Sequence, residues 1–274
     1  MISELKQKHF NKCLELLNEN GQMEAYAIIN GINPGRVFVD DPIAPSTGLI
    51  WLGNNDGFIF FGDSNNAHFN VEINDFIDHI IIPQAKTLQL NWFEAIGNHS
   101  GWDESLESLF NHRPLASWNQ RVYQLHAKDY NKNKKFELEP EYKRFSIQKD
   151  LYKQKDSYRN WNYLEGKILG YWDSLNDFFT NGLGSCIVYH QDIISYCFSG
   201  FVNRNVQCVN IETCPDHRGK GLAKKNAQFL IEECFENQMI PYWDCMEENK
   251  ASIAVARKLG FQRVYDYKGF EFRI

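Results

Sequence analysis

The sequence predicts an α/β protein whose C-terminal half is a mixed, twisted sheet with helices packed on it. Strand-like runs alternate with segments of helical spacing from about residue 144 to the end. The chain has 274 residues, of which 43% are hydrophobic. This length and composition suit two domains, or one large domain, with a real core.

The predicted organisation has an N-terminal α/β domain, a linker and a C-terminal domain, over residues 1–127, 128–143 and 144–274. Lys128 to Glu141 is charged and polar and contains Pro140, which is typical of a linker. The first strand of the C-terminal domain is expected at Phe136 to Leu138 or at Arg144 to Ile147.

The N-terminal half predicts its own series of elements. Met1 to Asn20 and Ile73 to Lys86 have helical spacing, and Pro83 should end or kink the second of these helices. A further helix is expected at 103–110, and strands at 36–40, 49–52, 58–61, 89–95 and 120–126. This order repeats the one expected for the C-terminal half.

The C-terminal elements follow from spacing and turn residues. Ile168 to Phe179 has helix-like spacing, and Asn181 to Gly184 should stop this helix. Two strands, 185–189 and 193–202, should form a hairpin that turns at His190 to Asp192. Val206 to Thr213 is the next expected strand.

The segment from Pro215 to Ala223 predicts an anion site between that strand and a helix starting at Leu222. Gly219 and Gly221 have no Cβ, so the backbone can approach a ligand closely. The first-turn N–H groups of a helix lack internal partners and, with the helix dipole, attract anions. Arg218 and Lys220 add positive charge. The expected ligand is a phosphate or pyrophosphate, although neither common nucleotide-loop spacing is present.

A second motif follows downstream. Pro241 to Cys245 is strand-like, Asn249 opens a helix over Ala251 to Leu259, and Lys-Leu-Gly-Phe ends it. Taken singly, these features are an ordinary strand, N-cap and helix stop. Their order, with Asn249 placed 31 residues after Arg218, makes coincidence a poor explanation.

Arg218, Gly221 and Ala223 match R-x-x-G-x-A, and with the second motif the last 90 or so residues resemble the GNAT superfamily of N-acetyltransferases. The Tyr-Trp-Asp-Cys run before Asn249 is similar to the zwittermicin A resistance subgroup. The resemblance implies a GNAT-type sheet in the C-terminal half. The N-terminal half is then either a degenerate GNAT-like domain without cofactor binding or an unrelated α/β domain.

The resemblance also implies acetyl-CoA as co-substrate. The backbone of Ile211, Glu212 and Thr213 would bond the pantetheine arm, and one of their N–H groups would face the developing oxyanion. Asn249 would cap its helix and bond the pantetheine. The residues expected to hold the pyrophosphate are Arg218, Gly219, Lys220, Gly221, Leu222 and Ala223.

Two carboxylates are candidates for catalysis. Glu212 adjoins the expected reaction centre and could act as general base, directly or through water; the alternative is a solvent-facing strand residue. Asp244 is the second candidate and could instead orient a cationic substrate. Many GNAT enzymes have a Tyr as general acid where this chain has Ala256. The acid is then unassigned, with the alternatives Tyr242, Tyr265 and Tyr267.

The charge, the apolar runs and the cysteines of the sequence bear on its binding partners and on its location in the cell. A net charge of −6 and a pI of about 5.8 exclude a broad nucleic-acid surface. The start of the chain lacks a signal-peptide apolar core, and no apolar run reaches membrane-spanning length, so we expect a cytoplasmic protein. Seven cysteines without C-x-x-C indicate neither a disulfide framework nor zinc, and no metal is expected.

The predicted function is acetyl transfer from acetyl-CoA to a primary amine of a small molecule, such as an antibiotic, by direct attack in a ternary complex. Two alternatives stay open: a CoA-binding sensor without catalysis, and protein N-acetylation. The sequence predicts no particular oligomeric state and no particular acceptor.

Overall fold

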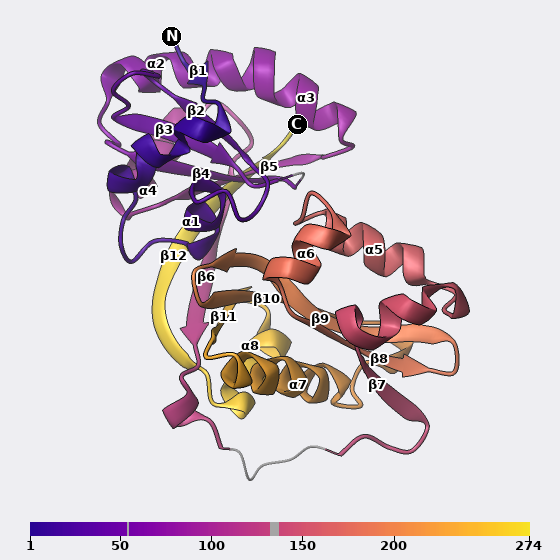
Figure 1. The fold of residues 1–274 in the computed structure, drawn as a ribbon. Coiled ribbons are helices and arrows are strands. Elements are labelled where there is room, and N and C mark those ends of the chain that lie inside the picture. Colours follow the sequence, from indigo (N-terminus) through magenta and orange to yellow (C-terminus); the bar gives the residue numbers. More distant parts are fainter. Residues whose placement is uncertain (54, 132–136) are drawn as a thin grey trace. The chain divides into compact units, whose positions relative to one another are not determined.

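The computed structural model describes residues 1–53, 55–131 and 137–274 (Figure 1). These residues form two compact units: Met1–Gln120 together with Asp266–Ile274, and Arg121–Tyr265. The sequence-based limits, 1–127 and 144–274, follow chain order and did not foresee that the last segment joins the first unit. It does so because Phe270 and Phe272 are buried in that unit's core.

The first unit has a mixed sheet in the order β1-β2-β3-β4-β5-β12. Strands β4 and β5 are parallel and the other neighbours are antiparallel. The aromatic side chains Phe58, Phe60, Phe93 and Phe272 pack in its core. The strands are β1 (Ser3–Glu4), β2 (Arg36–Val39), β3 (Thr47–Trp51), β4 (Gly57–Gly62), β5 (Trp92–Gly97) and the end of β12 (Gln262–Arg273).

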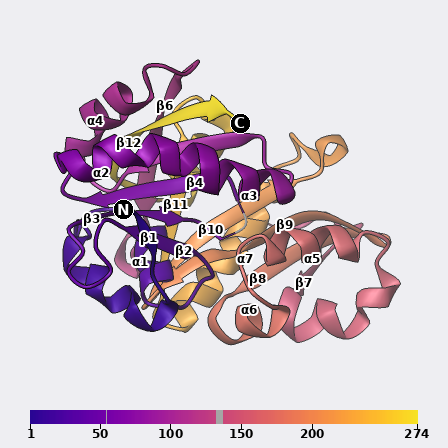
Figure 2. The same cartoon turned by 90° about the horizontal axis from the view of Figure 1, so that it is seen from above.

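The helices of the first unit are η1 (Gln7–Leu16), α1 (Met23–Ile29), α2 (Ala67–Phe76), η2 (Ile77–Ile81), α3 (Ile82–Thr87) and α4 (Gly101–Phe110). Figure 2 shows that α2 and α3 lie end to end along nearly the same axis. The predicted break at Pro83 takes the form of a π-helical turn, η2, directly before α3, with Pro83 in the first turn of α3. In the π-helical turn the Ile82 N–H donates to Ile77 O, so the helical bonding pattern changes directly before the residue that has no N–H.

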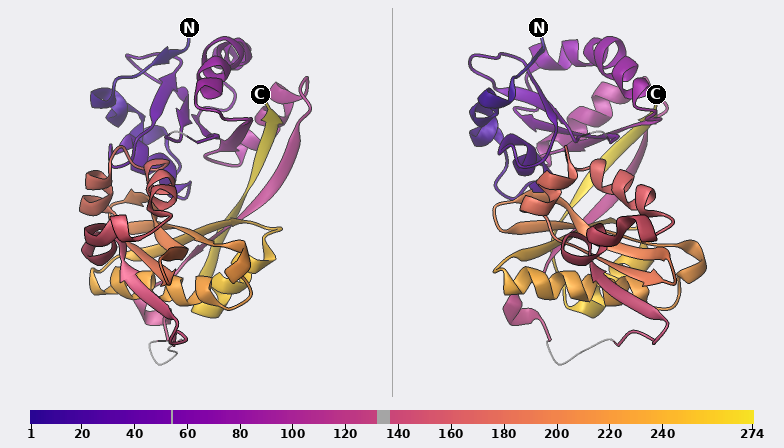
Figure 3. Two further views of the ribbon diagram at one scale, coloured as in Figure 1. Left: turned by 90° about the vertical axis from the view of Figure 1, so that its right-hand side faces the viewer. Right: turned by 45° about the vertical axis from the view of Figure 1, so that its right-hand side comes forward.

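The second unit has the strand order β6-β11-β10-β9-β8-β7, with β10 and β11 parallel. Helices α7 and α8 lie on one side of this sheet and α5 and α6 on the other (Figures 1 and 3). The strands are the end of β6 (Ala116–Gln124), β7 (Tyr142–Ser146), β8 (Gly184–Tyr189), β9 (Asp192–Asn203), β10 (Val206–Thr213) and β11 (Ile240–Met246). The helices are η3 (Ala127–Asp129), η4 (Ile147–Leu151), η5 (Tyr152–Ser157), α5 (Trp161–Leu169), α6 (Leu175–Asn181), η6 (Pro215–His217), α7 (Leu222–Glu236) and α8 (Lys250–Leu259).

The structure differs from the predicted helix at 168–179 and distinguishes the two alternatives for the first strand. The single helix expected over Ile168 to Phe179 is wrong: α5 ends at Leu169 and α6 begins after Ser174. The Ser174 hydroxyl accepts the Asp177 N–H and caps the new helix, which a periodicity reading overlooks. Of the two alternatives for the first strand, the second corresponds to β7, whereas Phe136 lies outside the described residues.

The two halves of the chain share one order of elements, as predicted. Three antiparallel strands lead to a helix, a parallel strand, a second helix and a final strand; these are β2, β3, β4, α2, β5, α4 and β6, and then β8, β9, β10, α7, β11, α8 and β12. The final strand of the second half pairs with β5 of the first unit, from Gly269 opposite Ile96 to Arg273 opposite Trp92. Within the described ranges, every helix is too short or too polar to span a lipid bilayer.

Candidate functional site

Strands β10 and β11 separate part-way along their length. They pair from Val206 opposite Ile240 to Cys208 opposite Tyr242. Strand β10 runs on to Thr213, still paired with β9 on its other side, without a β11 partner among the described residues. The separation leaves one edge of β10 open just before the loop that leads to α7.

The backbone groups on that open edge can be assigned. Cys214 donates its N–H to Ile194 O on the β9 side. Since successive peptide groups of a strand point to opposite sides, those of Ile211 and Thr213 point to the open edge, and that of Glu212 points to β9. Of the three residues predicted to bond a pantetheine arm, two therefore present backbone groups there, and Glu212 contributes its side chain.

A cavity of about 580 Å³ lies at this position, entirely within the second unit. Its volume falls in the range of small-molecule and cofactor sites. It is lined by the end of β10, the loop, the first turn of α7, β11 and one side of α8; the residues are Ile211, Glu212, Thr213, His217, Arg218, Gly219, Gly221, Leu222, Ala223, Lys224, Trp243, Asn249, Ala251, Ser252, Ala254, Val255 and Lys258. The cavity thus brings together nine of the predicted cofactor residues.

The loop glycines are required by their backbone conformation. Gly219 and Gly221 have φ angles of +77° and +73°, which side-chain-bearing residues rarely adopt. A Cβ at either position would meet no heavy atom within 4 Å. Gly221 is also the N-cap of α7 and offers no side-chain cap. The first-turn N–H groups of α7 are therefore available for an anion.

The cations of the loop have different placements. Arg218 donates from Nε to Thr213 O at 3.0 Å and closes the loop onto the strand end. Lys220 Nζ lies 3.4 Å from the Tyr142 hydroxyl, and it is the one predicted phosphate residue that does not line the cavity in the described structure. Lys224 and Lys258 do line it. The sequence analysis gave neither lysine a cofactor role, although Lys258 belongs to the Lys-Leu-Gly-Phe motif and Lys224 directly follows Ala223.

Asn249 has the predicted capping role. Its side-chain oxygen accepts the Ser252 N–H at 3.0 Å at the start of α8. At the other end, Gly260 has a φ of +96° and ends the helix in the left-handed conformation. This fixed helix presents Ser252 and Val255 to the cavity, whereas Ala256 is fully buried in the core.

A buried chain of polar side chains holds the strand end against α7. The hydroxyls of Thr213 and Ser195 lie 3.0 Å apart, and Asn226 donates to Ser195 Oγ at 3.3 Å. Ser185 in turn donates to Asn226 Oδ1 at 2.6 Å. The sequence reading missed this network, which joins three strands and a helix directly behind the loop.

The Glu212 side chain has partners on both α5 and β9. Its carboxylate accepts the Tyr163 hydroxyl at 3.0 Å and the Tyr196 hydroxyl at 2.5 Å, and Lys167 Nζ lies 3.4 Å away. Burial alone would raise the pKa of Glu212, but the two hydroxyls and the Lys167 charge outweigh it and leave the pKa below its ordinary value. The carboxylate is therefore ionised at neutral pH and only weakly basic.

The other candidate catalytic side chains lie elsewhere. Asp244 is not among the described residues that line the cavity; its neighbour Trp243 is, and adjacent strand residues face opposite sides. Tyr242 is fully buried, with its hydroxyl 2.9 Å from that of Tyr265. Tyr267 belongs to the other unit. No tyrosine lines the cavity in the described part of the chain.

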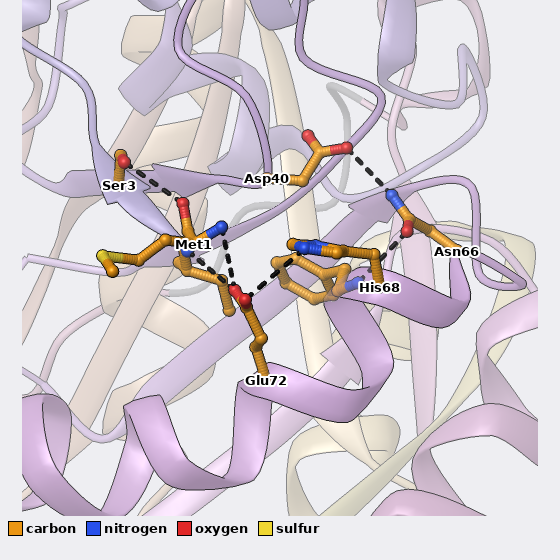
Figure 4. Close-up of polar contacts among 8 residues, drawn as sticks. Met1, Ser3, Asp40, Asn66, His68 and Glu72 are labelled. Carbon is orange, nitrogen blue, oxygen red and sulfur yellow. Dashed lines mark hydrogen bonds and ion pairs between the residues drawn. The ribbon is translucent and has the colours of Figure 1, made fainter.

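The start of α2 in the first unit, which corresponds to the start of α7 in the second, has different capping contacts (Figure 4). Asn66 caps α2 by accepting the Phe69 N–H at 3.1 Å, and its amide donates to Asp40 Oδ2 at 2.8 Å. Burial would raise the pKa of Asp40, but hydrogen bonds from Ser46 and Thr47 outweigh it, so the pKa is lowered. An ionised carboxylate thus lies where the second unit has an open, uncapped helix start. Figure 4 also shows Glu72, further along α2, with Met1 and His68.

Within the described part of the chain, no group of three or more His, Cys, Asp or Glu residues is arranged to hold a metal ion. The seven cysteines are free, and Cys214 alone is only partly buried.

Comparisons with known proteins match this architecture. A family model described as GNAT acetyltransferase matches residues 14–270. The chain is 29% identical over 243 residues to a Bacillus subtilis protein called uncharacterized N-acetyltransferase YdfB, covering 88% of this chain and 87% of that one. The likeness to the zwittermicin A resistance subgroup stays a prediction.

Solved structures share the fold over the whole chain. A GCN5-related N-acetyltransferase-like protein from Streptococcus suis superposes with a TM-score of 0.71 at 19% identity, over 97% of this chain and 99% of that one. A tandem GNAT protein from the clavulanic acid biosynthesis pathway gives a TM-score of 0.59 at 11% identity, over 100% and 98%. The predicted α/β class is thereby confirmed, and of the two alternatives left open for the N-terminal half these structures support the GNAT-like fold.

Proposed function

This chain belongs to the GNAT acetyltransferase family, and from that premise we propose that it transfers the acetyl group of acetyl-CoA to a primary amine of a small molecule. The observation that carries the proposal is the cavity at the open edge of β10, bounded by the uncapped start of α7. It offers N–H groups and cations at one end and an ionised carboxylate at the other.

The residues present fit a CoA thioester. The loop from Arg218 to Ala223, with the first turn of α7, would hold the pyrophosphate, because its backbone donors are open and its glycines leave free space. Lys224 and Lys258 add positive charge at this end. The pantetheine arm would lie along the open edge of β10 and bond Ile211, Thr213 and the Asn249 side chain.

The proposed reaction is one displacement at the acetyl carbon. A neutral amine attacks, the new C–N bond forms, and the C–S bond breaks with its electron pair leaving on the CoA sulfur. The Thr213 N–H, on the open edge, would stabilise the developing oxyanion. Glu212 would take the proton from the amine, directly or through a water.

Two features bear on this mechanism. The lowered pKa of Glu212 makes it a weak base until its donors rearrange. The leaving thiolate has no tyrosine to protonate it within the described cavity lining, so the proposal is that it leaves as the thiolate. Asp244, the second predicted carboxylate, does not line the cavity and takes no step in this proposal.

A two-stage experiment tests the proposal. Thermal shift with acetyl-CoA measures binding, and thiol release with a panel of small amines measures transfer. Binding with transfer supports the enzyme. Binding without transfer on any amine would instead favour the sensor, and transfer only to peptides would favour protein acetylation.

A further inference from the structure

Two opposite charges lie side by side and open to solvent at the edge of the proposed active site. Lys167 Nζ on α5 is 3.4 Å from Glu212 Oε2, and their side chains are 42% and 35% exposed. The Lys167 ammonium also lies 5.2 Å from the ring centroid of Tyr163, a residue that is 48% exposed. The three side chains form an open surface that is anionic, cationic and aromatic, which we name the charge-pair surface.

The ion pair between Lys167 and Glu212 contributes little to the stability of the protein. The Glu212 carboxylate already accepts one hydroxyl on each oxygen, from Tyr163 and Tyr196. An exposed ion pair adds about 0–1 kcal/mol to stability. Glu212 also lines the 580 Å³ cavity and a second cavity of about 10 Å³ on the α5 side, so in the proposed complex the pair would lie beside the thioester.

We propose that the acceptor is a zwitterion of the amino-acid class, whose ammonium binds Glu212 and whose carboxylate binds Lys167. This inference rests on the proposed acetyl transfer. A simple cationic amine would bring a second cation to a carboxylate that already has one. When a zwitterion binds, its ammonium replaces the Lys167 ammonium as the partner of Glu212, and its carboxylate replaces Glu212 as the partner of Lys167. The net charge of the surface stays the same. An α-amino acid carries its ammonium and its carboxylate on the same carbon atom, and this short charge separation suits the 3.4 Å distance between Lys167 Nζ and Glu212 Oε2.

The exchange also brings the proton that must be lost to the proposed base. Lys167 is one of the groups that lower the pKa of Glu212. When the acceptor carboxylate pairs with Lys167, the acceptor ammonium takes the place of Lys167 beside Glu212. The ammonium then lies against the carboxylate that is proposed to take its proton.

The test uses the whole chain and compares acceptors that share a side chain and differ in the carboxylate. Thiol release from acetyl-CoA is measured with leucine, isoamylamine and leucinamide, and with tyrosine, tyramine and tyrosinamide. We expect kcat/KM to be about 10- to 100-fold higher for each amino acid than for its decarboxylated amine, the size of one charge-assisted hydrogen bond. Lys167→Met should remove this preference by lowering the amino-acid values alone, and Lys167→Arg should retain it.

Lys155 supplies the matched control. It lies in the same unit with its ammonium 5.1 Å from the ring centroid of Tyr152, so Lys155→Met removes a similar lysine–tyrosine contact away from Glu212 and should keep the preference. Acetyl-CoA affinity, measured by calorimetry, should be the same in all variants.

The outcomes separate the two proposals. Equal or faster turnover of the decarboxylated amines overturns the zwitterion and leaves acetyl transfer standing, as does an unchanged preference in Lys167→Met. Thiol release with none of the six compounds counts against the proposed transfer. In that case calorimetric binding of leucine and tyrosine to the CoA complex still decides the inference: selective binding that Lys167→Met abolishes supports it, and absent binding overturns it.

Discussion

The Ser185 hydroxyl on β8 donates to the Asn226 side-chain oxygen on α7 at 2.6 Å, and both residues are fully buried. Asn226 also donates to Ser195, whose hydroxyl contacts Thr213 at the end of β10. One helix residue therefore fixes the strand end that carries the proposed reaction centre, as well as the helix that carries the anion site.

Asn226→Ala should destabilise the second unit by about 1–3 kcal/mol, because two buried serine hydroxyls each lose one hydrogen-bond partner. Denaturant unfolding measures this loss. The exposed Asn176 on α6 provides the control, and Asn176→Ala should change stability by no more than about 0.5 kcal/mol. An Asn226→Ala protein as stable as this control would contradict the role given to the network.

Gly221→Val should weaken acetyl-CoA binding more than tenfold, an order-of-magnitude expectation for losing a backbone phosphate contact. The residue has a φ of +73° and lines the cavity, so a branched side chain strains the loop and fills the ligand space. Calorimetry on folded protein provides the measurement. The control Gly166→Ala, on α5 in open space, should bind normally, and unchanged affinity in a folded Gly221→Val protein would defeat the assignment.

Glu212→Gln should lower the transfer rate by about a hundredfold to ten-thousandfold, the usual cost of removing a general base. Acetyl-CoA affinity should stay nearly intact, and the variant should recover rate as pH rises because more amine is then neutral. The lowered pKa keeps wild-type Glu212 ionised below the ordinary glutamate range, so protonation of this base should not itself lower the wild-type rate until the pH drops below that range. A wild-type rate and pH profile in Glu212→Gln would refute this role and direct attention to Asp244→Asn.

The full chain should bind one equivalent of acetyl-CoA. The capped start of α2 and the ionised Asp40 leave no open anion site in the described part of the first unit's helix start, and a carboxylate there repels phosphate. Calorimetric stoichiometry checks this expectation. Two equivalents per chain would show that the first unit has kept a CoA site.

Glu94→Gln should stabilise the protein at pH 8 and change it little at pH 5. Burial, the Asp56 charge and the Glu271 charge raise the pKa of Glu94 from 4.5 to about 7, and Glu271 lies directly opposite it on β12. The folded state therefore holds a proton that the unfolded chain releases, and stability is lost as pH rises through this window.

Melting temperatures at the two pH values measure the Glu94 effect. At pH 8 the melting temperature of the wild-type protein should be lower than that of Glu94→Gln. At pH 5 the difference between the two melting temperatures should be smaller. A gap between the two proteins that is constant across this range would rule out a raised pKa for Glu94.

Local sequence determined much of the second unit. The β10 strand has the predicted bounds, Val206 to Thr213, and α8 ends at Leu259 as expected. The loop glycines and the Asn249 cap could be recognised because their geometry is dictated by residues within a few positions of each other: a left-handed turn needs glycine, and an N-cap needs a side-chain acceptor. Periodicity alone failed where α5 and α6 meet, since Ser174 can start a helix inside an otherwise helical pattern.

Tertiary structure decided what contiguous residues cannot encode. The three donors to Glu212 come from α5 and β9, and they turned a candidate base into an ionised, weakly basic carboxylate. The last strand completes the first unit because Phe270 and Phe272 find their apolar partners there, and burial depends on neighbours far away in the chain. The sequence by itself determined the motifs and their local conformations; only the folded chain determined which distant side chains meet, and so which charges the proposed site presents.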